Sequence, residues 1–134
     1  MIPSRFSPRP NLATNRKVIG ATKCELDGIQ FDSKIEKYFY SRAKMFGIWN
    51  QFKMKPRFLL QPGFMYFGKK IQDIEIIPDF IHIATGEIVD TKGWQTPDNK
   101  IKIKMLKYLN RDKMVTLIST QREVDRYLLK FLKR

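Results

Sequence analysis

Apolar residues recur at helical spacing in three parts of the chain. The first predicted helix spans residues 34–46, after Ser33 as a favourable N-cap, and ends before Gly47. The second starts at Thr96-Pro97-Asp98, an N-cap followed by a proline in the first turn, and a third is expected over 121–132. In the second helix the expected apolar stripe consists of Ile101, Met105, Tyr108 and Leu109.

Short apolar runs bounded by turn residues predict strands between these helices. A hairpin is expected over 24–31, and an irregular strand over 71–83 should turn at Thr85-Gly86 into a partner over 87–92. The other expected strands cover 57–61 and 64–67, joined by a turn at Pro62-Gly63, and 114–119. The order of elements predicts an α/β fold in which helices flank a mixed central β-sheet.

The first 23 residues differ in composition from the remainder. They include three prolines, five basic residues and no acid, which favours an irregular arm over a packed element. We therefore expect a basic, proline-containing arm over 1–23 and a single domain over 24–134, a normal size for one compact unit.

Charge indicates a polyanionic partner. The chain has 26 basic and 13 acidic residues, a formal net charge of +13, so nucleic acid is the first candidate. No apolar run is long enough to span a membrane, and residues 1–9 lack the apolar core of a signal peptide, so we expect a cytoplasmic protein. One cysteine, Cys24, and one histidine, His82, give little basis for disulfides, zinc sites or hydrolytic triads.

The acids are concentrated in one part of the chain. Residues 37–72 contain eight basic residues and no acid, whereas residues 73–98 contain six acids and one basic residue, Lys92. A solvated hairpin face would explain exposed acids. Asp79 and Asp90, however, lie beside apolar residues, and a hairpin turning at Thr85-Gly86 would bring them to neighbouring strands.

Two carboxylates about 4 Å apart repel by roughly 4 kcal/mol at an effective dielectric near 20, so such a pair needs a proton or a cation. Oxygen ligands favour Mg²⁺ or Mn²⁺ over zinc. Since side chains alternate along a strand, Lys92 shares a face with Asp90 while Thr91 points the other way, and Lys92 could hold the attacking water or stabilise developing charge. Glu36 has two readings: with Ser33 it forms a capping box, and it could also supply a third carboxylate to the site.

These residues resemble the PD-(D/E)XK nuclease superfamily. The matching elements are Glu36 after a Ser-x-x-Glu helix start, Pro78-Asp79-Phe80, and Asp90-Thr91-Lys92-Gly93. The chain is similar to small phage-encoded members, including the phage endonuclease I type of Holliday-junction resolvase. One departure is Asp90, where glutamate is common in the superfamily.

The resemblance implies a restriction-endonuclease-like core with elements in the order αβββαβ, and Mg²⁺-dependent hydrolysis of DNA by a homodimer. It further implies that Asp79, Asp90, the Thr91 carbonyl and Glu36 hold the metal and that Lys92 activates water.

Basic residues outside the acidic window are the candidates for DNA contact. Lys100, Lys104 and Lys107 share one face of the second helix, and Lys102 is a further candidate on that helix. The other candidates are Arg16, Lys17, Lys53, Lys55 and Arg57. Phosphate contacts of this kind position a substrate without reading its sequence, so we expect selectivity for DNA structure.

The leading hypothesis is therefore a metal-dependent DNA endonuclease that acts in phage recombination or DNA processing. A nuclease of restriction, repair or packaging type would share its chemistry. The alternatives are a non-catalytic nucleic-acid-binding module and a structural or partner-recruiting protein.

Overall fold

The computed structural model describes residues 24–91 and 95–132, and its centre is a mixed four-stranded sheet. The strands lie in the order β10-β9-β8-β3, with β10 parallel to β9 and the other pairs antiparallel. Their bounds are β3 Phe52–Met54, β8 Phe80–His82, β9 Ile88–Asp90 and β10 Val115–Leu117.

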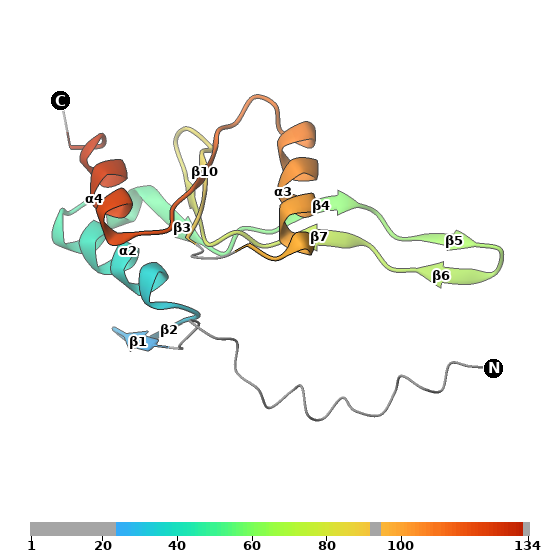
Figure 1. Cartoon of the computed structure of the whole chain (residues 1–134), viewed down its shortest axis with the longest axis horizontal. Helices are drawn as coiled ribbons and strands as arrows, with labels where there is room; N and C mark the ends of the chain where they lie inside the picture. The colour runs from blue at the N-terminus through green and yellow to red at the C-terminus, as the bar shows by residue number, and fades with distance from the viewer. Residues whose placement is uncertain (1–23, 92–94, 133–134) are drawn as a thin grey trace.

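Helices cover both faces of this sheet (Figure 1). On one face α2 (Lys34–Met45) and α4 (Gln121–Leu129) enclose a core that includes Phe39, Phe80 and Val89. On the other face α3 (Pro97–Leu109) packs over a second core. The prediction of a mixed α/β fold is thus confirmed. In the part of the chain that the structure describes, no helix could cross a bilayer.

Side-chain caps begin α2, α3 and α4. Ser33, Thr96 and Thr120 each accept a hydrogen bond from the backbone N–H three residues later. The caps at Ser33 and Thr96 confirm the predicted helix starts. A short hairpin of β1 (Cys24–Leu26) and β2 (Ile29–Phe31) precedes α2, with its turn at Asp27-Gly28 as expected. A single turn of 3₁₀ helix, η2 (Trp49–Gln51), leads into β3.

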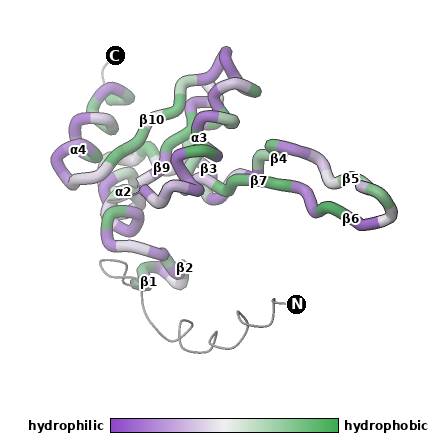
Figure 2. The backbone as a smooth tube through the Cα atoms, turned by 45° about the vertical axis from the view of Figure 1, so that its right-hand side comes forward, coloured by the Kyte–Doolittle hydropathy of each residue, from purple (hydrophilic) through white to green (hydrophobic). Residues whose placement is uncertain are grey.

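A long two-stranded ribbon is inserted between β3 and β8 and projects away from the domain (Figure 1). Its base is formed by β4 and β7, which pack under α3, and its tip is the β5–β6 hairpin. Apolar and polar positions both continue along it to the tip (Figure 2). The four strands are β4 Phe58–Gln61, β5 Phe64–Tyr66, β6 Lys69–Ile71 and β7 Ile74–Ile76.

The predicted turn at Pro62-Gly63 is wrong. The chain turns instead at Phe67-Gly68, where both residues have positive φ (+46° and +80°), as a two-residue type I′ hairpin requires. Gly63 serves a different purpose: a Cβ there would lie 2.8 Å from the backbone oxygen of Ile71, so glycine permits a close approach of the two strands.

The predicted strand over 71–83 is two strands in different sheets. β7 pairs with β4 in the ribbon, whereas β8 belongs to the central sheet, and the chain between them passes through Pro78. Proline removes a ladder hydrogen bond, which explains the break at this point.

The predicted apolar stripe of α3 is correct only for Met105, which packs against the second core. The buried residues are Ile103 and Leu106, while Ile101, Tyr108 and Leu109 are exposed. Apolar residues occur on more than one side of this helix, so periodicity alone could not identify the packed side.

We expect Phe39→Ala to lower the free energy of unfolding by about 3–5 kcal/mol, the usual loss for a buried phenylalanine. Phe39 is fully buried and stacks on Phe80 with ring centroids 4.2 Å apart. Urea denaturation measures the loss. Met45→Ala, at an exposed position of the same helix, is the control and should change stability by no more than about 0.5 kcal/mol. Equal effects of the two substitutions would contradict this assignment of the core.

Candidate functional site

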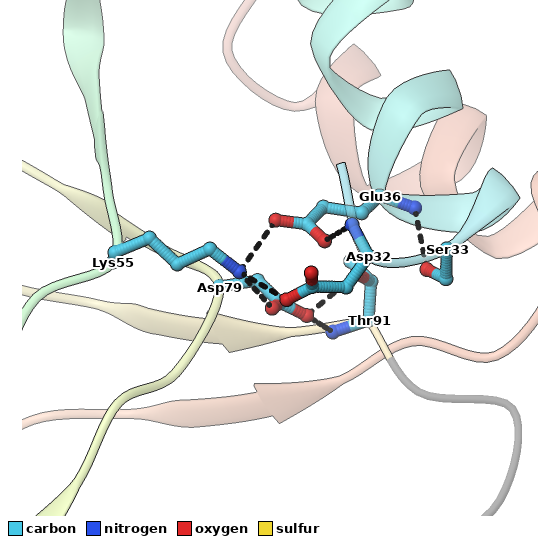
Figure 3. Close-up of polar contacts among 6 residues, drawn as sticks. All are labelled: Asp32, Ser33, Glu36, Lys55, Asp79 and Thr91. Carbon is cyan, nitrogen blue, oxygen red and sulfur yellow. Dashed lines mark hydrogen bonds and ion pairs between the residues drawn. The ribbon is translucent and has the colours of Figure 1, made fainter. Parts of the chain in front are cut away.

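The candidate site is a set of three carboxylates around one lysine ammonium (Figure 3). The Lys55 Nζ lies 2.9 Å from Glu36 Oε2, 3.4 Å from Asp79 Oδ1 and 3.1 Å from Asp32 Oδ2. Glu36 and Asp79 are buried, whereas Asp32 is exposed. If all groups are ionised, the cluster carries three negative charges and one positive charge.

The sheet positions Lys55 through its backbone. Lys55 follows the last residue of β3, and its N–H donates to the carbonyl oxygen of Asp79 at 2.9 Å. Its φ of +53° is in the left-handed region, which is uncommon outside glycine, asparagine and aspartate. The chain thus leaves β3 with a local conformational cost at the residue whose side chain reaches the carboxylates.

Glu36 combines two roles at the start of α2. Its backbone N–H donates to the Ser33 hydroxyl at 3.2 Å, and its Oε1 accepts from the Asp32 N–H at 3.0 Å. The helix-capping role is therefore real, although the bond goes to Asp32 and not to the N-cap residue. The other oxygen, Oε2, contacts Lys55, so capping and membership of the cluster occur together.

Asp79 is oriented by Thr91 across the β8–β9 hairpin. Asp79 Oδ2 accepts from the backbone N–H of Thr91 at 2.8 Å and from its hydroxyl at 2.7 Å, while Oδ1 faces Lys55. Thr91 is 2% exposed, so these bonds are protected from water. The resemblance implies a role only for the Thr91 carbonyl, so this use of its side chain is not predicted from the sequence.

Asp90 is the last residue of β9 and is buried. Phe80 pairs with Val89, so the next residues in this antiparallel register are Asp79 and Asp90. The predicted hairpin that brings the two aspartates to neighbouring strands is thus present. Lys92 and Trp94 lie outside the described residues, so the expected position of the Lys92 amine stays a prediction.

Electrostatics favour a cation in this cluster. Burial, and then the charge of Asp79, raise the pKa of Glu36, although Lys55 and the Asp32 N–H oppose the shift. Burial alone would lower the pKa of Lys55, but its hydrogen bonds to Glu36 and Asp32 and the charge of Asp79 outweigh burial and raise it. Lys55 is therefore charged at neutral pH, and it compensates carboxylates that could not otherwise be ionised together.

A metal ion would have to share the site with Lys55. Among the described residues, no group of three or more His, Cys, Asp or Glu side chains is placed to hold a metal. The donor set is nonetheless one that suits Mg²⁺ or Mn²⁺, because Glu36 and Asp79 turn carboxylate oxygens toward a cation that is already present. These two residues fit a metal ion only if the Lys55 ammonium withdraws.

The predicted nucleic-acid residues are distributed over several elements. On α3, Lys100, Lys104 and Lys107 are exposed and Lys102 is half-buried, and Lys53 is exposed on β3. Beside Lys104, α3 and β4 border a hollow of about 350 Å³. It is lined by Leu60, Lys104, Met105, Tyr108 and Leu109.

Two of the predicted phosphate contacts also form ion pairs within the chain. Lys55 contacts the carboxylate cluster, because β3 ends beside Asp79. Arg57 forms an ion pair with Glu75 across the ribbon, and its side chain remains 65% exposed, so its contact with DNA stays a prediction. Arg16 and Lys17 lie outside the described residues.

The contacts of His82 are those of a structural residue, because both ring nitrogens and one ring face are occupied by neighbouring side chains. Its ring nitrogens lie 2.9 Å from Thr85 Oγ1 and 2.9 Å from Gln51 Oε1, and its ring packs on Phe52. Burial lowers its pKa, which favours the neutral imidazole. These contacts hold the β8–β9 turn against η2.

The sequence does not predict that Asp32 and Lys55 belong to the carboxylate cluster. Asp32 directly precedes the N-cap, where an aspartate is explained by the helix start alone. Lys55 lies in a stretch of basic residues without acids, which indicates an exposed basic surface. Only the pairing of β3 with β8 shows that Lys55 reaches Asp79.

Comparison with known proteins yields one match. A family model described as "Protein of unknown function (DUF1064)" matches residues 16–124. Neither the curated proteins nor the solved structures include a significant match.

We expect Glu36→Gln to stabilise the metal-free protein at pH 8 by about 0.5–2 kcal/mol, the usual range for a stabilising substitution. The raised pKa of Glu36 means that the folded state binds its proton more tightly than the unfolded state does. Wild-type stability therefore falls as pH rises from the ordinary value of 4.5 through the folded-state pKa, and glutamine removes this loss. Urea denaturation at pH 4 and pH 8 should show the gain shrinking at pH 4; a variant less stable than wild type at pH 8 would refute the prediction.

Removal of the ammonium should have the opposite effect. We expect Lys55→Met to lower the free energy of unfolding at pH 7 by about 1–3 kcal/mol, since it leaves buried carboxylates uncompensated; partial exposure of Lys55 reduces the loss below that of a fully buried pair. Thermal denaturation without divalent ions measures it. Lys53→Met, at an exposed position of β3 two residues before Lys55, is the matched control. Equal stability of the two variants would exclude a stabilising role for the Lys55 ion pairs.

Proposed function

The chain belongs to the DUF1064 family, and we propose that it is a metal-dependent DNA endonuclease that hydrolyses phosphodiester bonds. The observation that carries the proposal is the pair of buried carboxylates, Glu36 and Asp79, turned toward one cation. Burying such groups costs free energy. A protein that retains them beside a cation has a site suited to cation-dependent chemistry.

The arrangement of elements supports the same proposal. The domain follows the chain order α2, β3, β8, β9, α3, β10, with the ribbon inserted after β3. This agrees with the αβββαβ order of the restriction-endonuclease-like core that the resemblance to PD-(D/E)XK nucleases implies. Glu36 lies on α2, Asp79 directly precedes β8 and Asp90 ends β9, which supports the roles that the resemblance implies for them.

In the proposed mechanism each residue has a defined task. Glu36 and Asp79 would hold the metal, and Thr91 fixes the Asp79 carboxylate with two hydrogen bonds so that its other oxygen remains turned toward the cation. Asp90 supplies a further carboxylate from β9. When bound, the metal polarises the phosphate and lowers the pKa of a coordinated water. Lys92, two residues beyond Asp90, stabilises the developing negative charge.

The Lys55 ammonium stands in for the metal before it binds. The Lys55 ammonium already compensates the charge of the carboxylates. A divalent cation would have to break the ion pairs of Lys55, and the free energy of breaking them would lower the affinity of the site for that cation. If a metal ion occupied the site, the Lys55 ammonium would be free to contact a substrate phosphate. Its predicted role in nucleic-acid contact therefore persists in the proposal at a different place, beside the reacting group.

DNA is the proposed substrate because the protein carries a net charge of +13 and exposes lysines on the helix that follows the candidate site. Five residues lie between Thr91 and the start of α3 at Pro97, so the α3 lysines are close in sequence to the site. Such contacts position a phosphate backbone without reading bases. We therefore expect cleavage that depends on the structure of the DNA and not on its sequence, as in the junction resolvases that the chain resembles.

A non-catalytic DNA-binding module is the second candidate. Its specific support is that the described residues form no ready group of three metal-binding side chains and that Lys55 already neutralises the acids. In that case the cluster would be purely structural.

Cleavage assays decide between the two candidates. We expect the wild type to cut a four-way junction, a flap or a plain duplex with Mg²⁺ or Mn²⁺ and to be inactive in EDTA. Asp79→Asn should lower the cleavage rate at least about 100-fold while DNA affinity is retained, because only the metal-dependent step is lost. Lys92→Ala should behave similarly.

The matched control is Asp73→Asn, which changes an exposed acid of the same acidic window and should leave cleavage unchanged. DNA affinity is measured by fluorescence anisotropy. Absence of cleavage of every substrate with both metals, or equal rates for Asp79→Asn and wild type, would reject the nuclease and leave the binding module.

A further inference from the structure

The tip of the ribbon exposes four consecutive large side chains. Phe64, Met65, Tyr66 and Phe67 are 46%, 65%, 57% and 89% exposed. Every residue from 62 to 70 is exposed, so neither face of the β5–β6 hairpin is covered by the domain (Figure 1). A monomeric domain rarely exposes a continuous apolar segment of this kind without a binding partner.

Charge at the tip favours a polyanion. Lys69 and Lys70 are the charged residues of the hairpin, and no acid occurs between residues 37 and 72. The register pairs Tyr66 with Lys69 and Met65 with Lys70. Since paired residues project to the same face, each face of the hairpin presents one ammonium beside at least one large side chain: Met65 on one face, and Tyr66 with Phe64 on the other. Two identical tips would repel each other, whereas a phosphate backbone would attract both.

The shape of the tip favours duplex DNA over RNA. A two-stranded β-ribbon fits a groove of B-form DNA, while the major groove of A-form RNA is too deep and narrow for side chains to read. Aromatic and methionine side chains can also insert between base pairs and unstack them. Neighbouring lysines would then contact the phosphates on either side.

The ribbon is attached to the candidate site at both ends. Lys55 is three residues before β4 and Asp79 is three residues after β7. Eleven residues separate Lys55 from Tyr66, which at about 3.3 Å per residue gives a reach of up to roughly 36 Å. This is about one helical turn of DNA.

We propose that the ribbon tip is a DNA-gripping element, in which Tyr66 and Phe67, whose rings are in contact at the turn, insert against a base step about one helical turn from the candidate site, while Lys69 and Lys70 contact the flanking phosphates. The proposal rests on DNA as the substrate class of the proposed function, and it adds the means by which a duplex is held and locally distorted. It does not require that the site cleaves.

Binding in EDTA tests the proposal independently of cleavage. Tyr66→Ser/Phe67→Ser should weaken duplex binding about 5- to 150-fold, the range expected for loss of one base–aromatic contact. Lys69→Gln/Lys70→Gln should reduce the slope of log Kd against log salt by about 2. Fluorescence anisotropy measures both effects, and 2-aminopurine placed along the duplex should brighten in the wild-type complex and stay dim with Tyr66→Ser/Phe67→Ser.

The matched control is Met114→Ser/Leu129→Ser, which removes two similarly exposed apolar side chains outside the ribbon. It should leave DNA affinity unchanged. Thermal denaturation and light scattering establish that each variant is folded and report its oligomeric state.

The outcomes separate the two proposals. If the wild type binds DNA through the tip but never cleaves, the gripping element stands and the nuclease fails. If the tip variants bind DNA as tightly as wild type, the gripping element is wrong even where cleavage occurs. Conversion of a dimer into a monomer with unchanged affinity per chain would instead identify the tip as a contact between two copies. Absence of any DNA binding by the wild type overturns both proposals.

Discussion

The ion pairs of one ammonium with three carboxylates constrain the whole candidate site. Glu36 and Asp79 are buried, and two such groups can be ionised side by side only with a compensating positive charge. Lys55 supplies that charge because the backbone bond between its N–H and the Asp79 carbonyl holds the end of β3 against the start of β8. The helix start at Ser33, the strand pairing and the cluster are therefore mutually dependent. A substitution at any one of these three places would change the geometry of the other two.

The same topology connects the site to the ribbon. Both strands of the ribbon leave the sheet beside the cluster, one after Lys55 and the other before Asp79. The base of the ribbon is fixed under α3 by Leu60 and Ile76, whereas its tip is free of the domain. A displacement of the ribbon tip would therefore act on the two backbone segments that carry Lys55 and Asp79. If DNA binds along the ribbon, substrate binding and the geometry of the carboxylates are physically coupled.

Much of the fold could be predicted from local patterns, and the failures have physical causes. Helix caps and the Asp79–Asp90 hairpin depend on residues close in sequence, such as Ser33 and Thr85-Gly86, and these predictions agree with the structure. The sequence predicts the ribbon turn at the wrong place because Pro62-Gly63 is a stronger turn signal than Phe67-Gly68. In the structure, strand pairing stops at Pro62-Gly63 and starts again beyond it. The position of Lys55 depends on pairing between distant strands, for which a single sequence carries no local signal.

The most direct measurement is a crystal structure of the protein soaked in Mn²⁺, with an anomalous difference map. We expect a manganese peak between the carboxylate oxygens of Glu36 and Asp79, at about 2.0–2.3 Å from them, with the Lys55 ammonium displaced from its present position. Retention of Lys55 between the two carboxylates, with no anomalous peak at the cluster at saturating Mn²⁺, would contradict it. The cluster would then be a structural ion-pair network in a cationic binding protein.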